Sequence, residues 1–188
     1  MRRGRGRSGT GRHSGFSLVE VAVALGVATF ALVSLMALLP VGIKTNQISS
    51  EETRASLILG TLEADLRNTH PLAKSDRSNL FGLALPYRMD TAGTHVVPNT
   101  RVALDTVSGA YSVGLDDDET PVAYSAFPPA RYQASVIYTQ VPVAGSDAPI
   151  HARLIVNWPA INTADPTKLT SLKSVRGYVE TYVTFPAP

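Results

Sequence analysis

One carboxylate, that of Glu20, stands at the head of an otherwise uncharged apolar segment. It follows Gly15-Phe16-Ser17-Leu18-Val19, and the next charged residue along the chain is Lys44. A charge placed in an apolar segment long enough to cross a membrane is costly unless it is paired, and such residues usually have a function. We therefore take Glu20 as the first candidate functional residue and ask what could pair with it.

The only acidic cluster, Asp116-Asp117-Asp118-Glu119, is a second candidate. Calcium prefers several oxygen ligands supplied by one loop, so a calcium site is one interpretation. The cluster lacks the alternating Asp-x-Asp-x-Asp-Gly spacing, and it lies between two strand-like stretches. A solvated hairpin tip is the favoured interpretation, and we predict no metal site.

No catalytic pattern is evident. The histidines lack metal-ligand spacing, there is no Gly-x-Ser-x-Gly nucleophile elbow, and no phosphate-binding loop follows a strand. We expect neither an enzyme nor a cofactor. The four histidines are His13, His70, His95 and His151.

Charge is unevenly distributed along the 188 residues. Five of the 17 basic residues are arginines within residues 1–15, a stretch that contains no acid. The remainder has 12 basic against 15 acidic residues, so it carries no nucleic-acid-binding footprint. Cysteine is absent, which excludes disulfides and thiolate chemistry. A basic stretch ahead of an apolar segment is typical of a cytoplasmic leader.

The uncharged run Val21–Leu39 would span about 28 Å as a helix, close to the thickness of a membrane's hydrocarbon core. Small residues recur within it and permit close packing against other helices. Pro40 and Gly42 then interrupt the pattern and predict a kink or local unwinding. These small residues are Ala22, Ala24, Gly26, Ala28, Ala31 and Ala37.

The helix is expected to resume and to end near Asn68-Thr69-His70-Pro71. Ala55, Leu59, Leu62 and Leu66, with Ile58 beside them, form one apolar stripe at helical spacing. Glu63 and Arg67 form a predicted i,i+4 ion pair. We divide the chain into a leader (1–15), an assembly or transmembrane half-helix (16–43), an amphipathic half-helix (44–70) and a β domain (71–188).

After Leu80 the pattern becomes strand-like, with turns rich in Pro, Gly, Asn and Asp between the strands. This predicts an α+β fold in which the second half of a long N-terminal helix packs on an antiparallel sheet. The candidate strands are Leu80–Arg88, Arg101–Thr106, Ala110–Leu115, Pro121–Ser125, Arg131–Val141, Ile150–Trp158 and Ser174–Phe185.

The stretch Gly15-Phe16-Ser17-Leu18-Val19-Glu20, with its basic leader and apolar run, closely resembles the class III signal of type IV prepilins and type II secretion pseudopilins. The resemblance covers about thirty residues. It implies cleavage after Gly15 by a prepilin peptidase, N-methylation of Phe16, and a glutamate, Glu20, at the fifth mature position. A narrower resemblance, carried by Leu38-Leu39-Pro40-Val41-Gly42, is to the pilin-like Verru_Chthon cassette protein B family.

The chain also departs from that family. Major pilins commonly have a kinking proline a few residues earlier, where this chain has Ala37, and many have a C-terminal disulfide. These departures favour a minor or specialised subunit. Beside the resemblance stands a physical reading: cleavage before Phe16 creates an amine about one helical turn from Glu20. In a bundle of subunits, the carboxylate of one can meet the amine of its neighbour.

Two hypotheses follow. In the first, the chain is a structural subunit of a type IV pilus-like or type II secretion-like filament. Its partners would then be a prepilin peptidase, other pilin or pseudopilin subunits and the bacterial inner membrane, with the leader cytoplasmic and the β domain outside. In the second, the chain is a single-pass membrane-anchored protein whose β domain binds a ligand or partner without assembling. Nucleic acid is not an expected partner of the mature chain.

Overall fold

The computed structural model describes residues 15–72, 75–122, 130–140 and 148–186. The chain divides into two compact units, Met1–Gln47 and Ile48–Pro188, which are described separately below. The first unit contributes the first part of helix α1, and the second contains the rest of α1 and all the strands.

Helix α1 runs from Leu18 to Asn68, within one residue of the predicted ends. Pro40 lies inside it, and helical structure continues on both sides of Pro40 and Gly42, so the local unwinding that we considered does not occur. A proline removes one backbone donor, here the one that would reach the Met36 carbonyl, and the other hydrogen bonds of the two flanking turns remain. Pro40 is therefore a weak point in a continuous helix.

The second unit is built on an antiparallel five-stranded sheet with the order β4-β3-β5-β6-β7. A separate two-stranded hairpin pairs β1 with β2. A short 3-10 helix, η2 (Pro166–Thr170), precedes the last strand. The strands are β1 (Tyr87–Met89), β2 (Val96–Pro98), β3 (Ser112–Leu115), β4 (Pro121–Val122), β5 (Tyr132–Gln140), β6 (Ile150–Trp158) and β7 (Gly177–Phe185).

The strand predictions are confirmed best where the apolar pattern is longest. The predicted strand Ile150–Trp158 has the bounds of β6, and Arg131–Val141 and Ser174–Phe185 contain β5 and β7. Two predictions are wrong. Leu80–Arg88 is not a strand except at Tyr87 and Arg88, and Arg101–Thr106 contributes only an isolated bridge at Leu104. The part of Pro121–Ser125 after Val122 lies outside the described residues.

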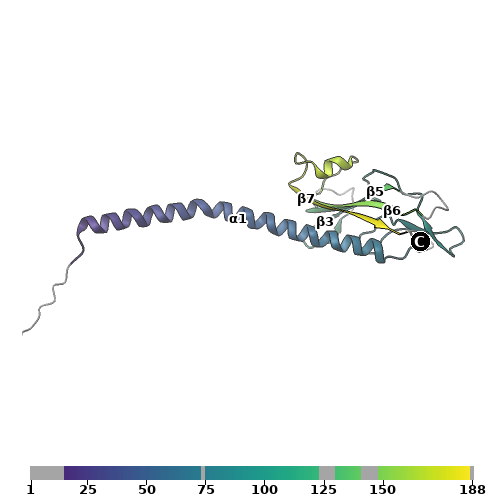
Figure 1. Cartoon of the computed structure of the whole chain (residues 1–188), viewed down its shortest axis with the longest axis horizontal. Helices are drawn as coiled ribbons and strands as arrows, with labels where there is room; N and C mark the ends of the chain where they lie inside the picture. The colour runs from purple at the N-terminus through teal and green to yellow at the C-terminus, as the bar shows by residue number, and fades with distance from the viewer. Residues whose placement is uncertain (1–14, 73–74, 123–129, 141–147, 187–188) are drawn as a thin grey trace, which may run out of the picture. The chain divides into compact units, whose positions relative to one another are not determined.

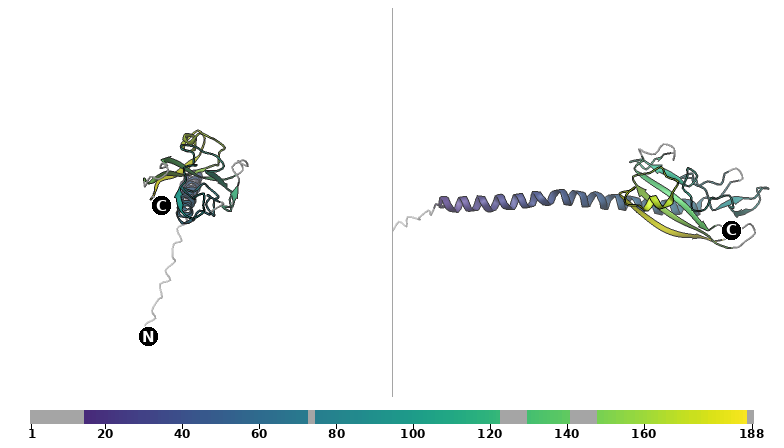
Figure 2. Two further views of the ribbon diagram at one scale, coloured as in Figure 1. Left: turned by 90° about the vertical axis from the view of Figure 1, so that its right-hand side faces the viewer. Right: turned by 90° about the horizontal axis from the view of Figure 1, so that it is seen from above.

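The α+β architecture and the packing of α1 on the sheet are confirmed. In the second unit, α1 and η2 lie on opposite sides of the five-stranded sheet (Figures 1 and 2). The side chains of α1 that are buried against the sheet come from Ala55, Ile58, Leu62 and Leu66, whereas the predicted Leu59 is only partly buried beside them. Ile58 and Leu59 are adjacent, and a 3.6-residue period permits either in the stripe.

The sheet supplies the other half of this core through alternate residues, because successive side chains of a strand point to opposite faces. Tyr132, Ala134, Val136 and Tyr138 of β5 belong to the same core as the buried residues of α1, and the Tyr138 hydroxyl donates to the Ala84 carbonyl at 2.7 Å. Burial raises the pKa of Tyr138 well above its ordinary value, so it remains a neutral donor.

The opposite face of the sheet has a smaller core. Ile137 and Ile155 pack there with Val107 and with Leu169 of η2. Leu169 is fully buried, so η2 covers this face in the way that α1 covers the other. The second unit therefore has three layers: helix, sheet, and a thinner cover of η2 and loops.

The helix stripe gives a direct test of this packing. Leu62→Ala removes a fully buried side chain and should lower the free energy of unfolding by about 2–5 kcal/mol. Leu57→Ala is the matched control, because Leu57 lies on the same helix with 64% of its surface exposed. Fluorescence of Trp158, the single tryptophan, would report denaturation of the full chain in detergent. Equal destabilisation by both substitutions would contradict the packing.

Gly177 gives a second test. A Cβ atom at this position would lie 2.3 Å from Cζ2 of the Trp158 ring, so Gly177→Ala must displace the indole and should destabilise the second unit. At Gly60, inside α1, a Cβ atom meets nothing within 4 Å. Gly60→Ala should instead stabilise by up to about 1 kcal/mol, because alanine favours a helix. Denaturation followed by Trp158 fluorescence would show whether the free energy of unfolding falls for Gly177→Ala and rises for Gly60→Ala.

Candidate functional site

The N-terminal end of α1 places the predicted cleavage-site residues outside the helix. Gly15 and Phe16 are non-helical and exposed, with 81% of the Phe16 surface accessible. The Ser17 carbonyl accepts the first helical hydrogen bond, from the Val21 N–H at 3.1 Å. The peptide bond between Gly15 and Phe16 is thus in exposed, non-helical backbone just before Ser17.

Ser17 has a local role that our sequence analysis missed. Its Oγ accepts a hydrogen bond from the Glu20 N–H at 3.4 Å, which makes Ser17 the N-cap of α1. The signal was present in the sequence, because Ser-x-x-Glu before an apolar run is the pattern of a capping box. Glu20 therefore lies at the third helical position, in the first turn.

This position favours a negative charge, because the unpaired N–H groups of the first turn give the helix end a partial positive charge. Glu20 is exposed, and its carboxylate has no partner among the described residues. Among residues 15–72, 75–122, 130–140 and 148–186, no charged side chain is paired with it. A partner that neutralises Glu20 has to come from outside the described part of this chain.

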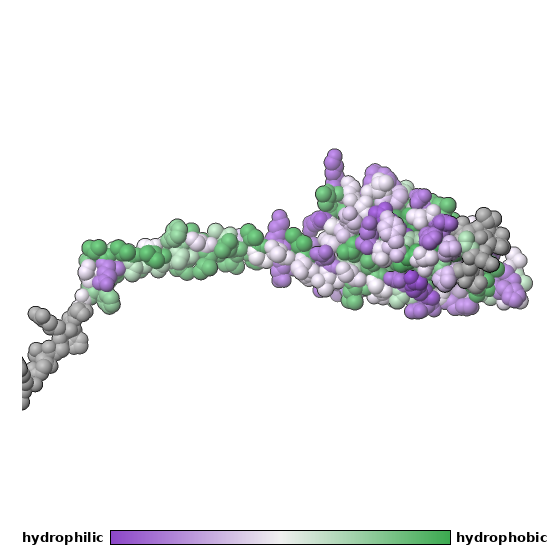
Figure 3. All heavy atoms as spheres, viewed as in Figure 1, coloured by the Kyte–Doolittle hydropathy of each residue, from purple (hydrophilic) through white to green (hydrophobic). Residues whose placement is uncertain are grey.

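The surface of α1 in the first unit is almost wholly apolar (Figure 3). Every residue from Gly15 to Ser50 is exposed, and α1 is long and apolar enough near the N-terminus to cross a membrane. The two hydroxyls of the apolar run are satisfied internally: Thr29 donates to the Leu25 carbonyl at 2.7 Å, and Ser34 to the Phe30 carbonyl at 2.8 Å. These side chains do not need water as a hydrogen-bond partner.

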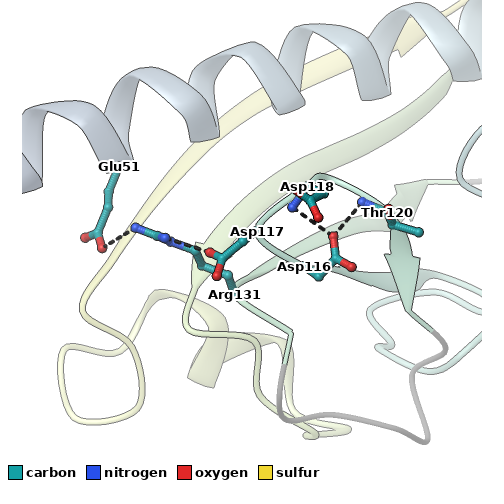
Figure 4. A network of polar contacts seen from close by, with 6 residues as sticks. All are labelled: Glu51, Asp116, Asp117, Asp118, Thr120 and Arg131. Atoms are coloured by element: carbon teal, nitrogen blue, oxygen red, sulfur yellow. Dashed lines mark hydrogen bonds and ion pairs between the residues drawn. The ribbon is translucent and has the colours of Figure 1, made fainter.

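The acidic cluster lies at the tip of the β3–β4 hairpin (Figure 4). The Asp116 carboxylate accepts hydrogen bonds from the backbone N–H groups of Asp118 at 3.0 Å and Thr120 at 2.8 Å. These bonds form an Asx-type turn, the structural interpretation that the sequence favoured. Across the described residues, no three His, Asp or Glu side chains come together in a way that could hold a metal ion.

Asp117 points elsewhere, to Arg131. The Arg131 guanidinium bonds the Asp117 carboxylate at 2.6 Å and lies 3.4 Å from the carboxylate of Glu51 on α1 (Figure 4). The hydrogen bond to Asp117 raises the pKa of Arg131. We call Glu51, Asp117 and Arg131 the Arg131 cluster. No sequence pattern indicated it, because Glu51 and Arg131 are eighty positions apart.

Shallow hollows lined by described residues of the second unit include the following two. One, of about 350 Å³, adjoins the Arg131 cluster and is also lined by Trp158 and Arg176. The other, of about 320 Å³, lies beyond the last turn of α1, between His70, Tyr87 and Pro186. We assign no chemistry to either hollow.

No protein-family model matches this chain, and neither a curated protein nor a solved structure is significantly similar to it. The functional argument therefore depends on the residues described above.

Proposed function

We propose that this chain is a pilin-like structural subunit, a minor pilin or pseudopilin. In this proposal it is processed after Gly15 and assembles through the first part of α1 into a type IV pilus-like or type II secretion-like filament. The observation that carries the proposal is the N-terminal end of α1: an exposed, non-helical Gly15–Phe16 bond, then Glu20 in the first turn, then an apolar helix surface with no cover from its own chain.

The uncovered apolar surface supports a membrane as the first environment. Hydrocarbon accepts a helix whose backbone and hydroxyl groups are bonded internally, as at Thr29 and Ser34. The five arginines of the leader favour a cytoplasmic N-terminus, which would place the β domain on the other side of the bacterial inner membrane. The small residues along the run would let neighbouring helices approach closely in an assembly.

Cleavage would supply the missing partner for Glu20. A new amine on Phe16 would lie just outside the helix, four residues before Glu20, and could meet the carboxylate of an adjacent subunit. Buried ion pairs add little net stability, because desolvation offsets attraction. They do fix register, since a subunit displaced by one step would leave a carboxylate unpaired among apolar helices. N-methylation of Phe16 retains this cationic amine.

The processing step can be tested directly. We expect mass spectrometry of the full chain expressed with a prepilin peptidase to find a methylated Phe16 at the N-terminus. Gly15→Leu should abolish cleavage, because it adds a bulky side chain at the cleavage site. Gly26→Leu is the matched control, since this glycine lies within the apolar run and far from the cleavage site. An intact Met1 on a membrane-bound chain, despite an active peptidase, would favour the non-assembling anchor.

The role of Glu20 requires a separate variant. Glu20→Gln keeps the side chain's size and removes its charge, so we expect normal membrane insertion and cleavage but at least tenfold less incorporation into filaments. The estimate corresponds to loss of roughly 1.4 kcal/mol of pairing. Glu52→Gln serves as a control on the same helix. Shearing and immunoblotting would measure incorporation, and equal amounts of both variants would remove this role.

A further inference from the structure

Within the second unit, the later turns of α1 have side chains buried against the sheet, whereas its first turns do not. Its buried side chains begin at Ala55 and continue through Ile58, Leu62 and Leu66. In the seven residues before Ala55, only Glu51 is even partly buried, and the other six are exposed. The first two turns of α1 in this unit therefore have no buried apolar contact with the sheet.

Glu51 supplies the contact that these turns otherwise lack. Its carboxylate, 17% exposed, lies 3.4 Å from the Arg131 guanidinium, and this is the one ion pair described between α1 and the sheet (Figure 4). The other ion pair of α1, between Glu63 and Arg67 at 2.8 Å, is internal to the helix.

The sheet holds Arg131 in position independently of Glu51. The Arg131 N–H donates to the Leu115 carbonyl at 2.8 Å, its guanidinium bonds Asp117 at 2.6 Å, and it lies over the Tyr132 ring at 5.7 Å. Asp117 is in turn fixed by the Asp116 turn. A cation oriented in this way loses little side-chain freedom when a carboxylate binds to it. The shorter bond to Asp117 indicates that Glu51 is the partner that can separate.

We propose that the Arg131 cluster is a releasable attachment that fixes the point at which α1 becomes bound to the sheet. With the ion pair formed, α1 is attached from Glu51 onward. With it broken, attachment begins at Ala55, and one further turn of helix is free to move. This device is a property of the second unit and does not depend on the proposed function.

The solvent exposure of the three side chains determines how strongly the charges of the Arg131 cluster attract each other. Glu51 is largely shielded, whereas Arg131 and Asp117 are 42% and 74% exposed, so solvent screens part of the attraction. A contact of this kind opens and closes readily, unlike the apolar stripe from Ala55 to Leu66. Salt weakens it by screening, whereas salt does not weaken the apolar contacts in this way.

Distances between spin labels test the device in the full chain. Because the sequence has no cysteine, pairs can be placed freely: Ile48→Cys with Tyr182→Cys reports the first turn, and Leu57→Cys with Tyr182→Cys reports the helix beyond Ala55. All three positions are at least half exposed. Pulsed electron paramagnetic resonance in detergent would give both distance distributions.

In Arg131→Gln and Glu51→Gln we expect the population of displaced 48–182 distances to rise about fivefold, because each substitution removes the partly screened Glu51–Arg131 ion pair. The 57–182 distribution should not change. In the parent chain, 1 M salt should produce the same 48–182 change. Glu52→Gln and Arg176→Gln are the matched controls, one beside Glu51 on α1 and one lining the adjoining hollow.

Three results would overturn the proposal: unchanged 48–182 distances in both variants, equal changes in the Glu52→Gln control, or equal broadening of the 57–182 distances. The last would mean that Arg131 supports the whole helix–sheet interface. Should Arg131→Gln fail to fold by Trp158 fluorescence, Glu51→Gln decides alone, because it changes only one helix surface residue.

Discussion

Burial of one helix stripe beneath the sheet is the interaction on which the folded unit depends. Ala55, Ile58, Leu62 and Leu66 are each at most 3% exposed, and they share one hydrophobic core with buried residues of β5, β6 and β7. In proteins, helices gain most of their stability from such packing rather than from the intrinsic helix propensity of their residues. Between Leu18 and Gln47 every residue of the same helix is exposed in the described structure. Helix α1 therefore has a buried apolar stripe in its second part and an exposed apolar surface in its first, and large exposed apolar surfaces commonly mark contacts with lipid or with other molecules.

The sequence predicted those parts of the fold that depend on a repeated pattern. The 3.6-residue spacing identified the α1 stripe, and alternation within Arg131–Val141 identified the strand β5. It failed for β1 and β2, which have three residues each and are too short to establish a period. It also failed for Arg101–Thr106, where only Val102 is buried and Leu104 makes a single isolated bridge to Tyr138. The local unwinding considered at Pro40 does not occur, because the loss of one donor does not unwind a helix whose neighbouring turns are intact, and the kink there stays a prediction.

The residues of the candidate site also differ in whether the sequence could predict them. Gly15, Phe16 and Glu20 could be identified as candidates from the sequence, because the motif that they form is a run of neighbouring residues. The cap formed by Ser17 was equally readable and was overlooked, since Glu20 drew attention to pairing rather than to helix initiation. The Arg131 cluster could not be found from the sequence. Its three residues come from α1, the β3–β4 hairpin and the start of β5, and only the register of β3 with β5 brings two of them together.

The direction of β7 has a practical consequence. Gly177 packs on Trp158 beside the hollow that Glu51 lines, whereas the Arg67 guanidinium lies over the Phe185 ring and donates to the Thr184 carbonyl. The last strand thus runs alongside the second part of α1 in the same direction. The chain leaves β7 at the end of this unit farthest from Ile48. A reporter inserted directly after Pro186 would accordingly join the unit beside the last turn of α1, at the opposite end of β7 from the Arg131 cluster.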